Sequence, residues 1–337
     1  MRRAAITGIA GQDGTYLARW LLSQGYEVAG LIHAPFDREE PRLLRRFGPA
    51  GVAAIRWHAG SLEDPFSLVR FLKATQPDEI YHLAGLTDSR QSFAVPAQAF
   101  EAITLGTLRL LEAAREISGS ARVFLASSAE IFGAPAYSPQ DEQTRCHPVT
   151  PYGIAKLAAD HFGRLHRERY GQYVSLGILY NHESPLRTGN YLSSRVTRAV
   201  AAILRGDQQE LVLGDLSAER DWSDARDFVR GFWLALQAPL PADYLFASGQ
   251  TRRVADLVDT AFRAGGLDYR SFVRGAAAPA PAAPAAPLCG NPRKAETQLN
   301  WHREWTVEET VRDMVRAEIE QRPEIERADP VPARDAG

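Results

Sequence analysis

Short apolar runs alternate with longer amphipathic stretches through the first half of the chain. Residues 4–9 form an apolar run broken by glycine, and residues 15–26 then carry apolar side chains at helical spacing up to Gly25. The alternation predicts strands over 27–33, 53–60, 79–85, 121–127 and 173–181, and helices over 67–76, 104–117 and 152–171. Strands alternating with helices form parallel sheets covered on both faces. The pattern therefore predicts an α/β fold built on a doubly wound parallel sheet.

The pattern becomes irregular after about residue 181, where polar loops surround isolated strands predicted over 210–215 and 243–249. We expect residues 1–181 to form mainly a dinucleotide-binding domain. Residues 182–322 would form mainly a smaller substrate-binding lobe, interleaved with elements that return to the first domain, with the ligand in the cleft between them. The Ala/Pro-rich tract 275–287 reads as an extended loop, and residues 323–337 as a disordered tail.

Composition excludes several classes of protein. The 337 residues are 45% hydrophobic with a net charge of -2, so no basic excess indicates a nucleic-acid partner. No apolar stretch approaches the length of a membrane span, and the N-terminus does not resemble a signal peptide. Two cysteines, Cys146 and Cys289, make neither a disulfide framework nor a metal cluster. We expect a cytoplasmic protein with no membrane partner and no metal.

A glycine-rich loop follows the first predicted strand. Gly8, Gly11 and Gly14 occur in "GIAGQDG", just before the first predicted helix. Glycines at this position let the backbone approach a pyrophosphate, which the helix N-terminus attracts. The alternative is a purely structural turn. The next strand ends in Ile32 and His33 rather than in a carboxylate that would repel a 2′-phosphate, so charge does not exclude NADP.

Two arginines after the predicted strand 27–33 also bear on the choice between NADP and NAD. Arg38 and Arg42 follow closely enough to reach a 2′-phosphate, or they belong to a solvated surface. These residues leave the choice between NADP and NAD open.

Tyr152 and Lys156 lie four residues apart in a predicted helix, and therefore on one face. An ammonium group one turn away stabilises a phenolate, which makes the tyrosine a usable base. Ser128 directly follows the predicted strand 121–127 and could hydrogen-bond the same substrate hydroxyl. The alternative is a tyrosine and a lysine on the surface. Glu130 follows in "SSAEIFG", where a carboxylate is either a turn cap or a placed acid or base.

These motifs resemble the extended short-chain dehydrogenase/reductase superfamily, and further segments resemble GDP-mannose 4,6-dehydratases in order along nearly the whole chain. The most specific are "NHESP" (181–185 within "GILYNHESP") and "RDW" (220–222); "QPDEIYHLAG", "GTLRLLEAAR", "TPYGIAK" and "NPRKAETQLNW" support them. The resemblance implies a Rossmann-type fold and an NADP(H)-dependent hydro-lyase. Its substrate would be GDP-mannose or a related GDP-sugar such as a GDP-heptose, converted to the 4-keto-6-deoxy sugar by internal hydride transfer.

The resemblance also implies roles for individual residues. Tyr152 would be the base, Lys156 its electrostatic partner, Ser128 the hydrogen-bonding hydroxyl and Glu130 the base that removes the C5 proton. The cofactor would contact Gly8, Gly11, Gln12, Asp13, Gly14, Arg38, Ser61, Leu62, Leu83, Ala84, Gly85, Tyr152, Lys156, Leu179, His182 and Arg187. The nucleotide sugar would contact Ser89, Asn181, Asn190, Arg195 and Arg220. The family's usual dimer or tetramer would use Pro35–Phe47 as a cofactor loop between subunits.

Several ligand-contact positions depart from the family pattern. Ser61 stands where the family has an aspartate, and His33 and Ala34 stand where it has two arginines. The Ala/Pro tract replaces a segment that reaches the nucleotide. The reaction type is therefore better specified than the substrate. The alternatives are a nucleotide-sugar 4-reductase or 4-epimerase on the same fold, and a catalytically silent homologue.

Overall fold

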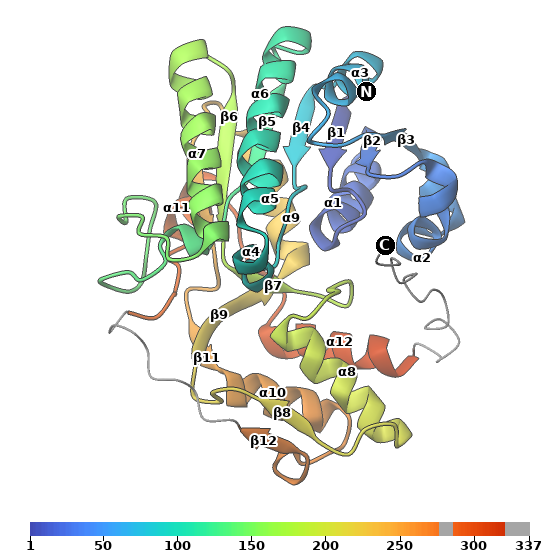
Figure 1. The fold of residues 1–337 in the computed structure, drawn as a ribbon, viewed down its shortest axis with the longest axis vertical. Helices are drawn as coiled ribbons and strands as arrows, with labels where there is room; N and C mark the ends of the chain where they lie inside the picture. Colours follow the sequence, from blue (N-terminus) through green and yellow to red (C-terminus); the bar gives the residue numbers. More distant parts are fainter. Residues whose placement is uncertain (276–285, 321–337) are drawn as a thin grey trace, which may run out of the picture.

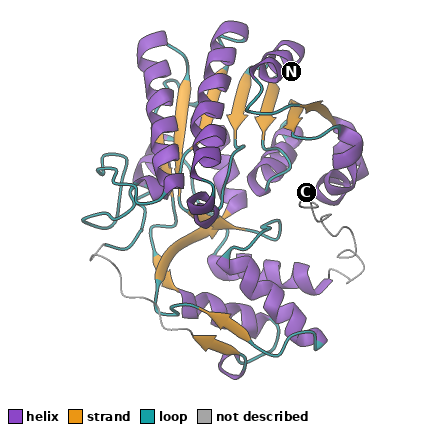
Figure 2. Ribbon diagram, in the orientation of Figure 1, coloured by secondary structure: helices purple, strands orange, loops and turns teal. Residues whose placement is uncertain are grey.

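The computed structural model describes residues 1–275 and 286–320. Its main sheet has seven strands in the order β3-β2-β1-β4-β5-β6-β10, each paired in parallel with its neighbours (Figures 1 and 2). The strands are β1 (Arg3–Thr7), β2 (Glu27–Ile32), β3 (Ile55–Ala59), β4 (Glu79–His82), β5 (Arg122–Ala126), β6 (Val174–Leu179) and β10 (Asp243–Phe246). The predicted doubly wound parallel sheet is thus confirmed.

Helices cover both faces of this sheet. One face packs against α1 (Gln12–Ser23), α2 (Phe36–Ala54) and α9 (Ala225–Gln237), and the other against α3 (Pro65–Thr75), α6 (Gly106–Ile117) and α7 (Pro151–Tyr170). Leu17 and Phe228 belong to the first buried cluster, and Leu68 and Leu110 to the second. A short run of α4 (Ser89–Ala94), α5 (Pro96–Phe100) and the π-helix η1 (Glu101–Leu105) leads into α6. Because both faces are covered, the central strands are largely apolar, as in β6.

Local signals at both ends define α7, the helix that carries Tyr152 and Lys156. The Thr150 side chain accepts a hydrogen bond from the Gly153 amide at 2.9 Å, and Pro151 occupies the first helical position. The helix ends at Gly171, whose φ of 66° suits a residue without a side chain. The strand β5 ends at Ala126, two residues before Ser128, and the 3-10 turn η2 (Ala129–Ile131) follows and contacts α7.

The segment after β2 differs from the sequence-based expectation. We predicted a loop over Pro35–Phe47, whereas the structure has the helix α2 there. Two prolines, Pro41 and Pro49, obscure its helical pattern, and Gly48 at φ 67° produces a kink inside it. Buried Leu43 and Phe47 hold the helix against the main sheet, so tertiary packing outweighs the poor local propensity.

The remaining elements form a smaller lobe below the carboxyl ends of the main sheet (Figure 1). Its sheets join β7 (Asn181–Glu183) and β11 (Thr251–Arg253) to β9 (Glu219–Asp224), and β8 (Leu211–Leu213) to β12 (Val273–Gly275). Its helices are α8 (Leu192–Arg205), α10 (Val254–Ala264) and α12 (Val307–Glu320), and the 3-10 turn η3 (Tyr269–Ser271) leads into β12. The short helix α11 (Arg293–Gln298) packs instead on β10 of the main sheet. One apolar cluster that includes Trp222 and Phe262 fills this lobe.

The lobe bears on two expectations about domains. The strand predicted over 243–249 is β10, which returns to the edge of the main sheet. The division at residues 181 and 182 stays a prediction. Most of the Ala/Pro tract (276–285) and the expected tail (323–337) lie outside the described residues.

The strand order reverses between β1 and β4, which diverge to opposite halves of the sheet. A crevice outside the carboxyl ends at such a reversal is the usual ligand site of an open α/β sheet. In the described part of the chain, no helix has the length and apolar character needed to cross a membrane.

Candidate functional site

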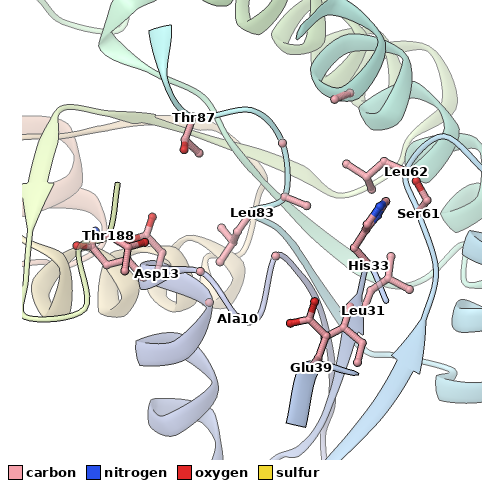
Figure 3. Close-up of a pocket in the computed structure, with 18 of the residues that line it drawn as sticks. Ala10, Asp13, Leu31, His33, Glu39, Ser61, Leu62, Leu83, Thr87 and Thr188 are labelled. Carbon is pink, nitrogen blue, oxygen red and sulfur yellow. Dashed lines mark hydrogen bonds between the residues drawn. The ribbon is translucent and has the colours of Figure 1, made fainter. Parts of the chain in front are cut away.

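A pocket of about 570 Å³ lies at the strand reversal, over the glycine loop and the N-terminus of α1 (Figure 3). Gly8, at φ 75°, packs so closely on the segment after β4 that a Cβ there would meet the Ala84 nitrogen at 2.8 Å. A Cβ on Gly14 would meet the Gly8 oxygen at 2.3 Å. This backbone cradle beside a helix N-terminus fits a dinucleotide pyrophosphate.

Most of the predicted cofactor contacts line this pocket. The predicted residues among its walls are Gly8, Gly11, Gln12, Asp13, Gly14, Ser61, Leu62, Leu83, Ala84, Gly85 and Arg187. Figure 3 shows Ser61, Leu62 and His33 at the end beside β2 and β3, and Asp13 and Thr188 at the other end. The pocket therefore extends from the β2–β3 edge toward the second lobe.

We expect Gly14→Ala to weaken dinucleotide binding and lower the melting temperature. The added methyl group would also approach the Ile9 Cα to 2.6 Å, so the loop backbone has to move. Gly214→Ala is the matched control, because its Cβ would enter open space. Fluorescence titration with NADPH and a thermal melt measure both effects. Equal affinities for wild type and Gly14→Ala would contradict this account of the cradle.

Buried polar side chains hold the strand ends beside the glycine loop. The Thr7 hydroxyl lies 2.7 Å from His82 Nδ1 and accepts from the Ala84 amide, and Thr107 lies 3.1 Å from Nε2. Burial lowers the pKa of His82 to about 3. Since the Thr107 hydroxyl donates to the Ile103 carbonyl, it accepts from Nε2–H, and Thr7 then donates to Nδ1. A neutral histidine thus ties β1, β4 and α6 together.

A second pocket of about 840 Å³ adjoins the first and contains the predicted chemical groups. Both pockets share a set of wall residues: Asp13, Leu83, Thr87, Arg187 and Tyr191. The second is also lined by Ser128, Glu130, Tyr152 and Lys156, so residues from the end of β5 and from α7 converge in one cavity. Leu179 and His182, the other predicted cofactor contacts, line it too. A ligand reaching through the shared walls would meet both sets of residues.

Tyr152 and Lys156 lie at the buried side of this pocket. Burial raises the pKa of the Tyr152 phenol, and the nearby Ser128 hydroxyl acts against that rise. The Lys156 Nζ donates to the Ala126 carbonyl at 2.7 Å and lies 5.9 Å from the centre of the Tyr152 ring. Burial lowers the pKa of Lys156 to about 8. Both groups are therefore shifted toward their neutral forms before any cofactor charge acts on them.

The Glu130 carboxylate faces the same pocket and is held by two hydroxyl groups. Ser89 donates to its Oε2 at 2.6 Å, and Thr150 donates to the same oxygen at 2.8 Å. Among the described residues, every side-chain hydrogen bond of this carboxylate goes to Oε2. The oxygen Oε1 is thus left for a ligand. The turn also has its own cap, because the Ser128 hydroxyl accepts from the Glu130 amide at 3.2 Å. Capping is therefore done by Ser128 and not by the Glu130 side chain.

An ion pair between Asp13 and His182 lies where the two pockets meet. His182 Nδ1 is 2.7 Å from the Tyr180 carbonyl oxygen, so it carries a proton, and Nε2 is 2.9 Å from Asp13 Oδ2. Burial alone would lower the pKa of His182, but Asp13 raises it above the usual range. His182 in turn holds the pKa of Asp13 low against the effect of burial. The ring also stacks on Phe228, with centroids 4.3 Å apart.

Predicted substrate contacts are only partly brought together. Ser89, Asn181, Asn190 and Arg220 line the second pocket, whereas Arg195 lies outside both pockets and donates to the Val212 carbonyl at 2.9 Å. Arg38 is also outside both, exposed on α2. One helical turn later, Arg42 lines the first pocket and donates to the Ala10 carbonyl at 3.2 Å. The register of α2, which the sequence did not reveal, decides between these two arginines.

Sequence reasoning missed several residues of the site, among them Thr87, Thr150 and Tyr191. Thr87 and Tyr191 line both pockets and are joined by a hydrogen bond of 2.8 Å between their hydroxyl groups. Thr150 both caps α7 and donates to Glu130. The motif "TPY", a capping residue before proline, could have revealed the cap; no sequence signal pairs Thr87 with Tyr191, because they are far apart in the chain.

Comparison with known proteins agrees with this geometry. Residues 5–314 match the family model described as GDP-mannose 4,6 dehydratase. The chain belongs to the GDP-mannose 4,6-dehydratase family. It is 37% identical over 324 residues to GDP-mannose 4,6 dehydratase 1 of Arabidopsis thaliana, covering 94% of this chain and 90% of the relative. It is 36% identical to GDP-mannose 4,6-dehydratase of Sinorhizobium fredii, covering 94% of this chain and 96% of that relative.

Solved structures share the fold of this family member at lower identity. RMD from Pseudomonas aeruginosa, complexed with NADPH, has a TM-score of 0.79 at 23% identity, covering 95% of this chain and 99% of its own. The dTDP-glucose 4,6-dehydratase DesIV from Streptomyces venezuelae, with NAD and TYD bound, has a TM-score of 0.81 at 24% identity, covering 94% and 96%. These structures therefore share the doubly wound α/β fold of this GDP-mannose 4,6-dehydratase family member.

Proposed function

We propose that this chain is an NADP(H)-dependent GDP-mannose 4,6-dehydratase that converts the nucleotide sugar to its 4-keto-6-deoxy derivative. One observation carries the proposal. Glu130 lines the pocket that also holds Ser128, Tyr152 and Lys156, and the hydroxyl groups of Ser89 and Thr150 both bind its Oε2. An epimerase or a reductase needs only the serine, tyrosine and lysine. The carboxylate is the additional group that removal of water requires.

Tyr152 takes the proton of the C4 hydroxyl in the first step, while Ser128 hydrogen-bonds that hydroxyl. A nicotinamide dinucleotide held over the glycine loop would supply the acceptor, and later the donor, of the hydride. The buried Lys156 ammonium, 5.9 Å from the phenol ring, favours the phenolate and so lowers the barrier to proton transfer. The anchor from Lys156 to the Ala126 carbonyl keeps this charge next to the end of β5.

Glu130 acts on the ketone that results. A 4-ketone acidifies the C5 hydrogen, and Oε1 removes that proton while Ser89 and Thr150 hold Oε2. The C6 hydroxyl leaves as water with the proton that Glu130 took from C5. The hydride would then add to C6, and C5 takes up a proton that balances the one Tyr152 removed from the C4 hydroxyl. Oxidation at C4 and reduction at C6 balance, so cofactor is not consumed. We therefore reassign Ser89 from a direct substrate contact to a group that orients Glu130.

The two pockets divide the ligands between them in this proposal. The glycine loop, with Ser61, Leu62 and the segment 83–85, would hold the adenosine and pyrophosphate end of the cofactor. Arg42 replaces Arg38 as the candidate for a 2′-phosphate, with His33 beside it in the same wall. His182 and Arg187 would face the middle of the cofactor, and Asn181, Asn190 and Arg220 the nucleotide sugar.

We further propose a homodimer that assembles in the cytoplasm. Phe93 on α4, Phe100 on α5, and Ile154 and Leu165 on α7 are exposed apolar side chains on neighbouring elements of one side of the sheet. A second copy of this surface would cover these side chains and form a dimer. The cytoplasmic location is supported separately by Cys146 and Cys289, which are free thiols as expected in a reducing compartment. Light scattering of the purified protein tests the dimer, and a monomeric mass would refute it.

Incubation of the protein with GDP-mannose and a panel of other nucleotide sugars, with substoichiometric NADP, tests the activity. Mass spectrometry should show loss of water from GDP-mannose over many turnovers per cofactor. Consumption of one NADPH per product would indicate a reductase instead. An unchanged mass with rearranged stereochemistry would indicate an epimerase. If no sugar gave a product, the dehydratase proposal would be wrong and the chain would be a catalytically silent homologue.

A further inference from the structure

The helix α7 carries a buried carboxylate for which the proposed reaction has no use. Asp160 is only 2% exposed and lies one turn beyond Lys156. It lines neither pocket. Its Oδ2 accepts a hydrogen bond of 2.5 Å from the hydroxyl of Ser127, which is itself buried. A carboxylate in such a place is costly unless its charge has a partner or a task.

Asp160 and Lys156 together hold consecutive residues at the carboxyl end of β5. Lys156 binds the carbonyl of Ala126, and Asp160 binds the side chain of Ser127. The Ser127 amide donates to the Gly177 carbonyl, so the residue is fixed to β6 as well. The next residue is Ser128, whose hydroxyl must meet the same substrate oxygen as Tyr152. One helix therefore positions the serine, the tyrosine and the lysine relative to each other.

The charges around Asp160 connect it with Lys156 electrostatically. Burial raises the pKa of Asp160 to about 7, and Ser127, Arg164 and Lys156 oppose that rise while Asp243 of β10 adds to it. Arg164 is engaged with Asp243 at 2.7 Å, and the Cys146 thiol lies in the same environment. Both Asp160 and Asp13 raise the pKa of Lys156 against burial, and neutral His82 faces it from β4.

We propose that Asp160 is a positioning residue for hydride transfer, which fixes Ser128 through Ser127 and keeps Lys156 charged. The inference rests on the roles proposed above for Ser128 and Lys156. Its electrostatic part concerns the chain itself, without substrate or cofactor, and can therefore be tested whether or not the proposed reaction is right.

The composition of the chain allows a direct measurement. It contains only three lysines, Lys73, Lys156 and Lys294. With lysine labelled by ¹³C at Cε, NMR gives three resonances whose pH titrations report each ammonium group, and Lys156→Arg identifies the signal of interest. In Asp160→Asn the amide oxygen still accepts from Ser127 but the negative charge is gone. The Lys156 midpoint should then fall by about one pH unit, as expected for loss of an adjacent opposite charge.

Glu168→Gln is the matched control, since it removes an exposed carboxylate of the same helix about 18 Å from Lys156 along the axis. It should leave the Lys156 midpoint unchanged. An unaltered midpoint in Asp160→Asn overturns the electrostatic part of the proposal. In turnover assays, the alkaline limb of kcat should move to lower pH in Asp160→Asn, because the ammonium group is then lost at lower pH.

Ser127→Ala tests whether Asp160 positions Ser128 through Ser127, and it provides that test even if the Asp160→Asn protein does not fold. It removes the hydrogen bond and leaves the carboxylate. We expect kcat to fall about tenfold, which corresponds to the net contribution of one hydrogen bond. The KM for the sugar nucleotide should be nearly unchanged. Ser127→Thr keeps the hydroxyl and should restore kcat. If Ser127→Ala has the kcat of the wild type, Asp160 does not act on Ser128 through Ser127.

Discussion

Glu130→Gln is expected to stop the loss of water while hydride transfer from C4 continues, so that reduced cofactor accumulates. The amide keeps both hydroxyl contacts possible at its oxygen but cannot take a proton from C5. We expect turnover to fall by about 10² to 10⁴-fold, the usual contribution of a general base. Because the first step needs only Ser128, Tyr152 and Lys156, the absorbance of NADPH should rise on addition of substrate. The bound sugar should be trapped as the 4-ketone.

Deuterium at C5 gives an independent readout of the same step. In D₂O the wild type should incorporate solvent deuterium at C5 of the product, and Glu130→Gln should not. Glu130→Asp is the matched comparison, because it retains a carboxylate but withdraws it by one methylene group, and we expect partial activity. Wild-type turnover by Glu130→Gln would remove this residue from the mechanism and leave its bonds to Ser89 and Thr150 as structural contacts.

Tyr152→Phe is expected to abolish both half-reactions, which distinguishes it from Glu130→Gln. Without the phenol oxygen no group takes the C4 hydroxyl proton, so turnover should fall by about 10² to 10⁴-fold and no NADPH should accumulate. Burial raises the pKa of this phenol, so its activity depends on the positive charges of Lys156 and of the bound nicotinamide. Lys156→Met should therefore resemble Tyr152→Phe in stopped-flow measurements of the first hydride transfer.

The folded state should tolerate the loss of the Tyr152 hydroxyl. Tyr170→Phe is the control, because it removes a phenol oxygen from the exposed end of the same helix. It should have the activity and melting temperature of the wild type. Prompt NADPH formation by Tyr152→Phe would show that another group accepts the C4 proton and would contradict the proposed role.

Much of the fold and of the chemistry could be predicted because it depends on local pattern. The buried strands of a parallel sheet are short apolar runs, and the spacing of Tyr152 and Lys156 places both on one helical face. The helix α2 was missed because Pro41, Gly48 and Pro49 disrupt its pattern, although its apolar face packs on the sheet. Arg42 was consequently not preferred over Arg38.

Long-range contacts account for the other differences. Ser89 was expected to bind substrate, yet its hydroxyl lies 2.6 Å from Glu130, which is 41 positions away. The pairs Thr87–Tyr191 and Asp13–His182 join segments more than a hundred residues apart. Arg195 was placed on the substrate by resemblance, but its guanidinium group is bound to the Val212 carbonyl.

The sequence by itself determined the parallel sheet, the glycine loop and the pairing of Tyr152 with Lys156, since each follows from residue type and spacing along the chain; Ser128 could be predicted as the residue after a buried strand. It also brought Glu130 next to Ser128, because both lie in one short turn. Only the tertiary structure decided which oxygen of Glu130 is held, which arginine faces the cofactor pocket, and that Asp160 is buried beside Lys156 and Ser127. Those features depend on distances between elements, and burial in a shared low-dielectric interior sets the charge of each group.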